Sequence, residues 1–308
     1  MSFFRIVAAA FLALALAIAS AAKAADVAIV LSDTSGAYAE FAAAFQQFSE
    51  GSNWRVRWTG GADNLDATPR VDLIVAVGAD ATRAALRRSG TIPIVATLLP
   101  RSAYERALAD AGINRSRANT TAIFLDQPIG RLLAFVRYLL PERHRIGILA
   151  GPETRALLPQ IRQAAGATGV GLETEDLEST GNPVPAANHL LVRSDVLLAL
   201  PDSAVYRRDN IRAILLTSYR FQRPVIGFSQ SLVTSGALAA IYSTPAQIAR
   251  QTVDLIKPLH RDATNLPPPQ APTLFAIAIN NNVAQALGLS VPDEPAIRRA
   301  LNADKDAR

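Results

Sequence analysis

The chain has 308 residues, a formal net charge of +5 at pH 7, and hydrophobic side chains at 50% of its positions. It contains no cysteine, which excludes disulfides, a thiolate nucleophile, a cysteine-based metal site and the lipidated cysteine of a bacterial lipoprotein. The arginines are scattered and form no basic block, so we expect no nucleic-acid partner.

Residues 1–24 have the pattern of a secretory signal peptide. Arg5 precedes the apolar run Ile6–Ile18, and Ala22-Lys23-Ala24 matches a cleavage site. The alternative is an uncleaved N-terminal anchor. No later run is long and apolar enough to span a bilayer, so we expect no membrane insertion after signal removal. An exported chain without an anchor is best retained in a periplasm, and we predict a soluble protein of the Gram-negative periplasm.

The first hundred residues after the signal repeat the order strand, polar turn, helix. Buried-strand runs end in polar turns, and apolar residues at helical spacing follow. This alternation is typical of a parallel α/β sheet. The predicted elements are the strand Asp26–Leu31, the helix Tyr38–Phe48, the strands Trp54–Trp58 and Val71–Val77, the helix Ala81–Arg88 with Asp80 as its cap, and the strand Ile92–Thr97.

A second alternation follows an extended segment at Thr120–Leu125 and predicts a second, similar lobe. The tail Val291–Arg308 is charged, and we expect it to be frayed. The predicted strands of this half are Arg145–Leu149, Gly169–Glu173, Val196–Leu200, Val225–Phe228, Ala237–Tyr242 and Ala271–Ile279. The predicted helices are Ile129–Leu140, Arg155–Ala165, Ala186–Ser194, Asp209–Tyr219, Thr244–Leu259 and Asn280–Leu287.

The residues offer no catalytic constellation. His144, His189 and His260 are far apart and lack metal-ligand spacing, so we expect no metal. The segment 227–231 lacks the second glycine of a nucleophile elbow. No phosphate-binding loop or dinucleotide motif occurs, so we expect no cofactor. We therefore predict a protein that is not an enzyme.

Small polar residues follow the apolar strand runs in both halves, where an open parallel sheet binds small molecules. Loop hydroxyls and helix N-termini suit a carboxylate, and Asp126 and Asp202 are candidates for a ligand ammonium. For any single hydroxyl a helix cap is the favoured alternative, so the prediction depends on the whole set. The candidate ligand-binding residues are Ser32, Ser35, Tyr38, Gly78, Ala79, Thr97, Asp126, Thr154, Asp202, Ser203, Tyr206, Ser229 and Tyr242.

Segments spread over nearly the whole mature chain carry a resemblance to a known family. They are Val71–Gly78, Thr121–Asp126, Leu198–Tyr206 (LALPDSAVY), Pro224–Ser229, Gly236–Tyr242 (GALAAIY), Gln247–Gln251 and Ile279–Leu289 (INNNVAQALGL). With them the chain resembles the periplasmic substrate-binding proteins of ABC transporters, in the family related to tryptophan/phenylalanine-binding proteins. One segment departs from that family, because Leu98-Leu99-Pro100-Arg101 stands where an Asp-Pro pair is common.

The resemblance implies a type I periplasmic-binding fold, α/β, with two Rossmann-like lobes of parallel sheets joined by a three-strand hinge. It places one lobe at 26–121 with 244–276, the other at 122–243 with 277–295, and a frayed tail at 296–308. It further implies that a small polar solute, such as an amino acid or another carboxylate, is captured in the interlobe cleft. Hinge closure would then present the solute to an ABC permease in the inner membrane. The alternative is a periplasmic sensory or interaction module that feeds a membrane signalling protein.

Overall fold

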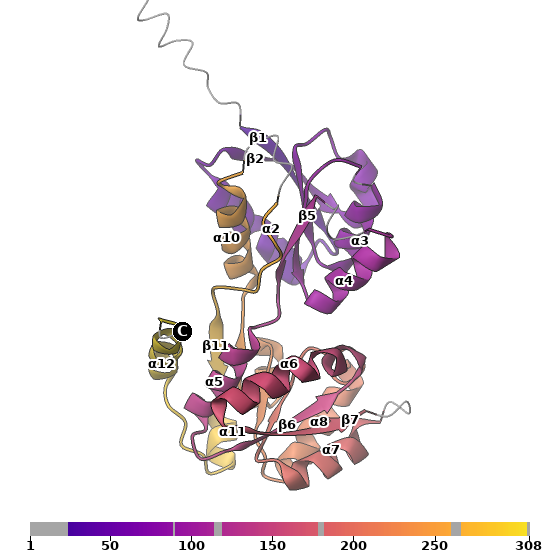
Figure 1. Cartoon of the computed structure of the whole chain (residues 1–308). Coiled ribbons are helices and arrows are strands. Elements are labelled where there is room, and N and C mark those ends of the chain that lie inside the picture. The colour runs from indigo at the N-terminus through magenta and orange to yellow at the C-terminus, as the bar shows by residue number, and fades with distance from the viewer. Residues whose placement is uncertain (1–23, 89, 114–118, 178–181, 260–265, 307–308) are drawn as a thin grey trace, which may run out of the picture. The chain divides into compact units, whose positions relative to one another are not determined.

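The structure is a computed structural model that describes residues 24–88, 90–113, 119–177, 182–259 and 266–306 (Figure 1). The signal-peptide prediction, apart from Ala24, and His260 lie outside these residues. The chain divides into two compact units. Unit 1 comprises the described residues up to Thr97 and within Ala107–Ala122 and Ala249–Pro268, and unit 2 comprises those within Leu98–Arg106, Ile123–Ile248 and Pro269–Arg308.

A five-stranded sheet in the order β2-β1-β3-β4-β5 organises unit 1. The pairs β1–β2, β1–β3 and β3–β4 are all parallel. Every residue of β3 is buried, as expected for a strand that helices cover on both faces. The strands are β1 (Ala25–Leu31), β2 (Trp54–Gly61), β3 (Leu73–Val77), β4 (Ile94–Leu99) and β5 (Thr120–Phe124). The helices within this unit are α2 (Gly36–Ser49), η1 (Ala62–Ala67) and α3 (Ala79–Arg88). Two further helices, α4 (Arg101–Asp110) and α10 (Pro245–Ile256), each have residues in both units.

Unit 2 contains a six-stranded sheet in the order β11-β10-β9-β8-β6-β7. Its pairs are parallel except β10–β11, which is antiparallel and ends the sheet. The strands are β6 (Arg145–Ala150), β7 (Gly171–Asp176), β8 (Val196–Leu198), β9 (Val225–Gly227), β10 (Ala239–Tyr242) and β11 (Ala276–Ile279). The helices are α5 (Ile129–Leu139), α6 (Pro152–Thr168), α7 (Pro183–Arg193), α8 (Arg208–Arg220), α9 (Gln230–Thr234), α11 (Asn281–Ala286) and α12 (Glu294–Asp306).

Alternate residues of the unit 2 strands enter two different cores. On β6, Ile146 and Ile148 join the core beneath α5, α6 and α12, whereas Leu149 joins the core beneath α7 and α8. Val196 and Leu197 on β8 separate in the same way. Because successive strand residues face opposite sides, both faces of the sheet are buried, which explains the continuous apolar runs in the sequence. The predicted α/β class with two sheets and interleaved helices is confirmed.

The predicted frayed tail is wrong for its described part. Residues Glu294–Asp306 form α12, in which Ile297 and Leu301 are 1% and 6% exposed and belong to the core beneath α5. Their spacing of four residues puts both on one face of the helix. Burial of this short apolar face explains why a charged segment is ordered.

The segment after β4 contains a helix that was not predicted from the sequence, because α4 starts directly at Arg101. Leu98, at the end of β4, has a φ of +56°, a left-handed conformation that costs a residue with a Cβ about 1–2 kcal/mol. Asp80 does not cap α3 from outside as predicted. It lies in the first turn of α3 and pairs with Arg83.

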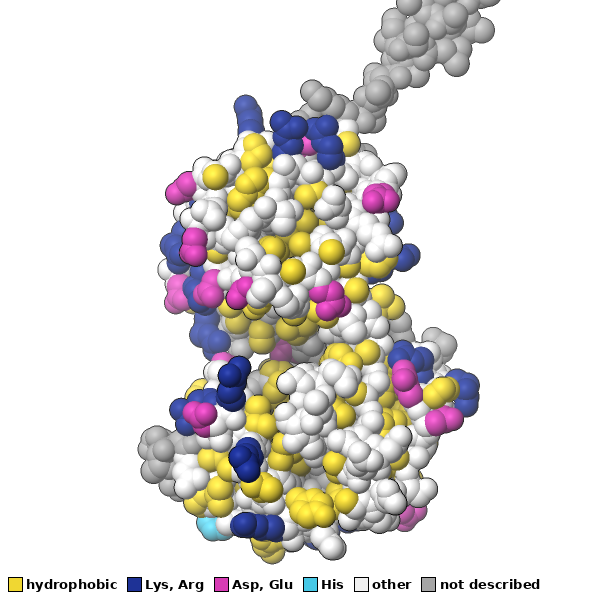
Figure 2. Space-filling view, turned by 180° about the vertical axis from the view of Figure 1, so that it is seen from behind, with side chains coloured by type: hydrophobic (Ala, Val, Ile, Leu, Met, Phe, Trp, Pro, Cys, Tyr) yellow, Lys and Arg dark blue, Asp and Glu magenta, His cyan; other side chains and the backbone are white. Residues whose placement is uncertain are grey.

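Basic and acidic side chains are interspersed on the face shown in Figure 2. Several arginines pair with acids on neighbouring strands or helices, such as Arg55 with Asp26 at 2.7 Å and Arg145 with Asp195 at 3.1 Å. Such pairs cancel part of the arginine charge locally.

Candidate ligand-binding site

A pocket of about 300 Å³ lies in unit 2, where the segments after several strands meet. It is lined mostly by apolar side chains, and polar groups lie at one side. Carboxyl ends of neighbouring parallel strands meet at one edge of a sheet, and β8, β9 and β10 each supply lining residues just at or after their ends. The lining residues are Pro100, Leu125, Gln127, Leu132, Ala199, Leu200, Pro201, Phe228, Ser229, Ile241, Tyr242 and Ser243.

The polar side of this pocket is a hydrogen-bonded group of side chains. The amide nitrogen of Gln127 donates to Ser243 Oγ at 2.8 Å, and Ser243 Oγ donates to the carbonyl of Leu274 at 2.6 Å. The other end of the Gln127 amide, Oε1, accepts from Arg131 at 2.7 Å. Gln127 and Ser243 are each 8% exposed. The orientation of the amide is thus fixed, with its two ends assigned to different partners.

Two of the predicted site residues, Ser229 and Tyr242, line the pocket. Ser229 is the N-cap of α9, where its Oγ accepts from the Leu232 N–H at 3.2 Å. The Tyr242 hydroxyl donates to Gln230 Oε1 at 2.7 Å. Both polar groups already have protein partners, so a ligand would share or replace these hydrogen bonds.

Asp202 directly follows the lining residue Pro201 and is only 3% exposed. Its Oδ2 accepts from the Thr154 N–H at 2.8 Å, and its Oδ1 accepts from the N–H groups of Ala204 and Val205 at 3.1 and 3.4 Å. The carboxylate therefore closes the first turn of α6 and the loop after β8. A ligand ammonium would have to compete with these hydrogen bonds.

Thr154 and Tyr206 carry buried hydroxyls without a hydrogen-bond partner among the described residues. The Tyr206 ring packs edge-on against Phe228, with centroids 5.7 Å apart. Burial raises the pKa of Tyr206, and the Asp202 carboxylate adds to this effect, so the phenol stays protonated. Tyr206 thus supports the pocket wall through Phe228.

Asp126 and Ser203 each have polar partners within unit 2. Asp126 Oδ2 accepts from the Arg101 N–H at 2.7 Å. Burial raises the pKa of Asp126, and the Arg101 N–H opposes this effect. The Ser203 hydroxyl donates to Glu153 Oε1 at 2.9 Å, and the same oxygen accepts from Arg106 at 2.9 Å. Glu153 is a polar neighbour that the sequence analysis did not select.

Unit 1 brings a second set of predicted residues together at the ends of β1 and β3. Ser32 Oγ accepts from the Ala81 N–H at 3.0 Å and so holds the start of α3. Gly78 has a φ of +92°, and a Cβ there would overlap the side chains of Ser32 and Tyr38. Burial is the main cause of the raised pKa of Tyr38. Ser32, Tyr38 and Gly78 therefore adjoin one another.

The remaining unit 1 candidates have other surroundings. Ser35 donates from its hydroxyl to Asp33 at 2.7 Å, and this hydrogen bond lowers the pKa of Asp33. Ala79 is the first residue of α3. Thr97 is fully buried, and its hydroxyl lies 3.5 Å from that of Thr252. Ser35 and Thr97 thus have local partners within unit 1.

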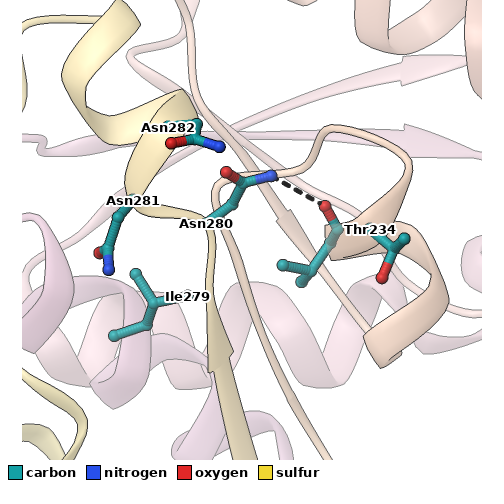
Figure 3. Close-up of a pocket in the computed structure, with 6 residues that line it drawn as sticks. Thr234, Ile279, Asn280, Asn281 and Asn282 are labelled. Carbon is teal, nitrogen blue, oxygen red and sulfur yellow. Dashed lines mark hydrogen bonds between the residues drawn. The ribbon is translucent and has the colours of Figure 1, made fainter.

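An open hollow of about 390 Å³ lies in another part of unit 2, around the start of α11 (Figure 3). Its central side chain is Asn280, which caps α11 through Val283 at 3.1 Å and donates to the carbonyl of Val233 at 3.1 Å. Figure 3 shows Thr234 on one side of Asn280 and Asn281 and Asn282 on the other. The amide of Asn280 is thus held by hydrogen bonds at both of its ends.

Metal and membrane features are absent from the described part of the chain. Its residues form no cluster of three or more His, Cys, Asp or Glu side chains that could hold a metal ion. None of its helices combines the length and the apolar character that crossing a membrane requires.

Comparison with known proteins places the chain in a family. The model of the ABC transporter substrate binding protein family matches residues 63–300, and the chain belongs to this family. It is thus a substrate-binding protein of the ABC type. A comparison with curated proteins gave no match.

Solved structures share its type I periplasmic-binding fold. A ligand-free, open substrate binding protein with adhesive properties from Clostridium difficile is 16% identical, with a TM-score of 0.70 over 88% of this chain and 97% of that chain. An ABC domain from Streptococcus pneumonia in complex with L-Trp is 15% identical, with a TM-score of 0.62 over 90% and 98%. A conserved domain protein from Vibrio cholerae is 20% identical, with a TM-score of 0.61 over 90% and 98%.

Proposed function

We propose that the protein is the periplasmic solute-binding component of an ABC importer and has no catalytic step of its own. It captures a small polar solute, such as an amino acid or another carboxylate, and delivers it to a permease in the inner membrane. The observation that carries the proposal is the pocket at the carboxyl ends of β8, β9 and β10 in a chain of the substrate-binding family.

The composition of the pocket suits reversible binding. Apolar side chains such as Leu132 and Ile241 can bury the body of a solute, and a few fixed polar groups such as the Gln127 amide can orient it. The solute would shift the protein toward the conformation that the permease recognises, provided that this conformation binds it more tightly. The complex with L-Trp in the Streptococcus relative makes amino acids the first compounds to test.

Export through a cleaved signal peptide is part of the proposal. The predicted cleavage site ends at Ala24, and β1 begins at Ala25, so cleavage there leaves the first strand whole. We expect a mature N-terminus at Ala25 in protein recovered from a periplasmic extract, measured by intact mass. A mature mass that retains residues 1–24 would contradict export by this route.

A thermal-shift screen with amino acids, other carboxylates and purines tests solute binding. A ligand at 100 times its dissociation constant stabilises the folded state by about 2.7 kcal/mol. Uptake of the compound that raises the melting temperature should fall in cells that lack the protein. If no solute class shifts the melting temperature, the proposed function fails.

A matched pair of variants tests the pocket itself. Ala199 lines the pocket and is 1% exposed, and Ala187 on α7 is fully buried outside it. Leucine at either position should cost about 1–3 kcal/mol by overpacking. Only A199L should abolish the ligand-induced shift. Equal ligand responses of A199L and A187L would place the binding site elsewhere.

A further inference from the structure

Arg131 contacts the pocket wall, and its partners among the described residues are all neutral. Its guanidinium donates to Gln127 Oε1 at 2.7 Å and to the carbonyl of Pro272 at 3.0 Å. It also lies 4.9 Å from the ring centroid of Phe275. Within the described ranges, Arg131 forms no ion pair with a carboxylate. Buried charges in proteins are generally paired, whereas this partly buried cation has only neutral hydrogen-bond partners among the described residues.

Arg131 keeps its positive charge, although no neighbouring acid among the described residues compensates that charge. Burial lowers the pKa of Arg131, and no neighbouring acid contributes an opposing effect. An arginine nevertheless stays protonated in a protein. A full positive charge therefore lies next to Gln127 in surroundings that screen it less than water does.

The Gln127 amide connects this charge to the pocket. Gln127 lines the pocket, and none of the described lining residues carries a charge. The nearest acid in sequence is Asp126, which accepts from the Arg101 N–H. The Arg101 guanidinium stacks on Phe124 at 4.4 Å, so a second cation lies beside that acid. Arg101 thus offsets the charge of Asp126, whereas no carboxylate among the described residues pairs with Arg131.

Arg298 provides an internal comparison. Its guanidinium lies 5.0 Å from the same Phe275 ring and donates to the Phe275 carbonyl at 3.0 Å. Unlike Arg131, it pairs with a carboxylate, that of Glu294. The two arginines therefore support the same ring but differ in whether their charge is compensated.

We propose that Arg131 is a positioning and specificity-determining residue that makes the pocket selective for carboxylates over their neutral isosteres. Its charge acts through the Gln127 amide, which it also holds in place. The ligand class is a small carboxylate with an apolar body, since the rest of the lining is apolar. This inference rests on the proposed function, and it adds that the same site prefers a negatively charged ligand.

The test measures affinities by calorimetry for two pairs of probes, each an acid and its amide. The pairs are phenylacetate with phenylacetamide, and L-phenylalanine with L-phenylalaninamide. The wild type should bind each acid more tightly than its amide. R131Q should lose about tenfold in affinity for the acids and less than about twofold for the amides. A tenfold loss is the size expected when the Arg131 charge and the ligand carboxylate are about 10 Å apart at an effective dielectric constant of about 20. R131K should keep part of the preference, and R298Q should keep the whole acid-to-amide ratio.

Each result decides for or against the proposal. Equal losses for acid and amide in R131Q would show that Arg131 only supports the fold, and equal affinities in the wild type would show no charge selection. Either result overturns the inference while solute binding stands. Binding of neither pair, or of the amides alone, overturns it as well. If neither pair binds but another solute class raises the melting temperature, the proposed function stands and only the inference about Arg131 fails. If no solute raises the melting temperature, both the proposed function and the inference fail.

Discussion

The carboxylate of Asp202 accepts a hydrogen bond of 2.8 Å from the backbone N–H of Thr154, in the first turn of α6. The first N–H groups of a helix have no acceptor inside the helix. Here Asp202, which lies 48 positions away in sequence, supplies an acceptor for one of them. Asp202 also accepts from Ala204 and Val205, so one buried carboxylate joins α6 to the loop after β8.

Replacing Asp202 should therefore reduce stability strongly. D202A removes the acceptor of several buried N–H groups and should cost about 2–4 kcal/mol of unfolding free energy. D202N keeps one carbonyl oxygen and should cost less. Urea denaturation followed by circular dichroism measures both. A loss below about 0.5 kcal/mol in D202A would show that water replaces the carboxylate at no cost.

Gly151 tests the same contact from the helix side. Its φ and ψ of −98° and −169° are accessible to alanine, but a Cβ there would overlap Asp202 Oδ1. G151A should cost about 1–3 kcal/mol by overpacking in the wild type and clearly less in the D202A background. A double-mutant cycle measures the coupling. Simple additivity of the two losses would contradict the contact.

Asp126 should make stability depend on pH. Burial raises the pKa of Asp126 in the folded state, so the folded protein holds this proton more tightly than the unfolded chain. The resulting stabilisation is present below the ordinary pKa of 3.8 and is lost as the pH rises through the raised value.

D126N, whose amide oxygen can still accept from the Arg101 N–H, should lack this dependence. Its stability relative to the wild type should therefore increase as the pH rises from about 3.5 to about 7, that is, from below the ordinary aspartate pKa to well above it. Urea midpoints across this range check the sign. A relative stability that falls with rising pH would mean that the ionised form of Asp126 is the favoured one.

The C-terminal helix should contribute to the stability of unit 2. Ile297 is 1% exposed in the core beneath α5, and I297A should cost about 2–4 kcal/mol. Arg299 on the same helix is exposed, and R299A should change stability by less than about 0.5 kcal/mol. Equal, small effects of both variants would mean that α12 is detached in solution.

The architecture followed from the sequence because both periodicities were strong. Runs such as LIVAV in β3 are continuous and apolar, and helices with apolar residues at helical spacing come between them. The tail could not be predicted in this way. Ile297 and Leu301 are spaced for one helix face, but charged neighbours dominate the segment, and only the core beneath α5 explains their burial.

Part of the pocket was predictable for the same reason. Ser229 and Tyr242 follow apolar strands and do line it. Gln127 and Arg131 were missed although they stand four residues apart, a spacing that lets side chains meet on a helix. Their roles depend on partners at Ser243 and Pro272, more than a hundred residues away, and no local pattern contains that information.

The division of the chain has a consequence for folding order. Residues Ala249–Pro268 belong to unit 1, and the following residues from Pro269 complete unit 2 with β11 and α12. Unit 1 is therefore complete in sequence only at Pro268, after most of unit 2 has been synthesised. Strict domain-by-domain folding from the N-terminus, the common route for larger chains, does not fit this order, because unit 1 must wait for a segment that follows most of unit 2.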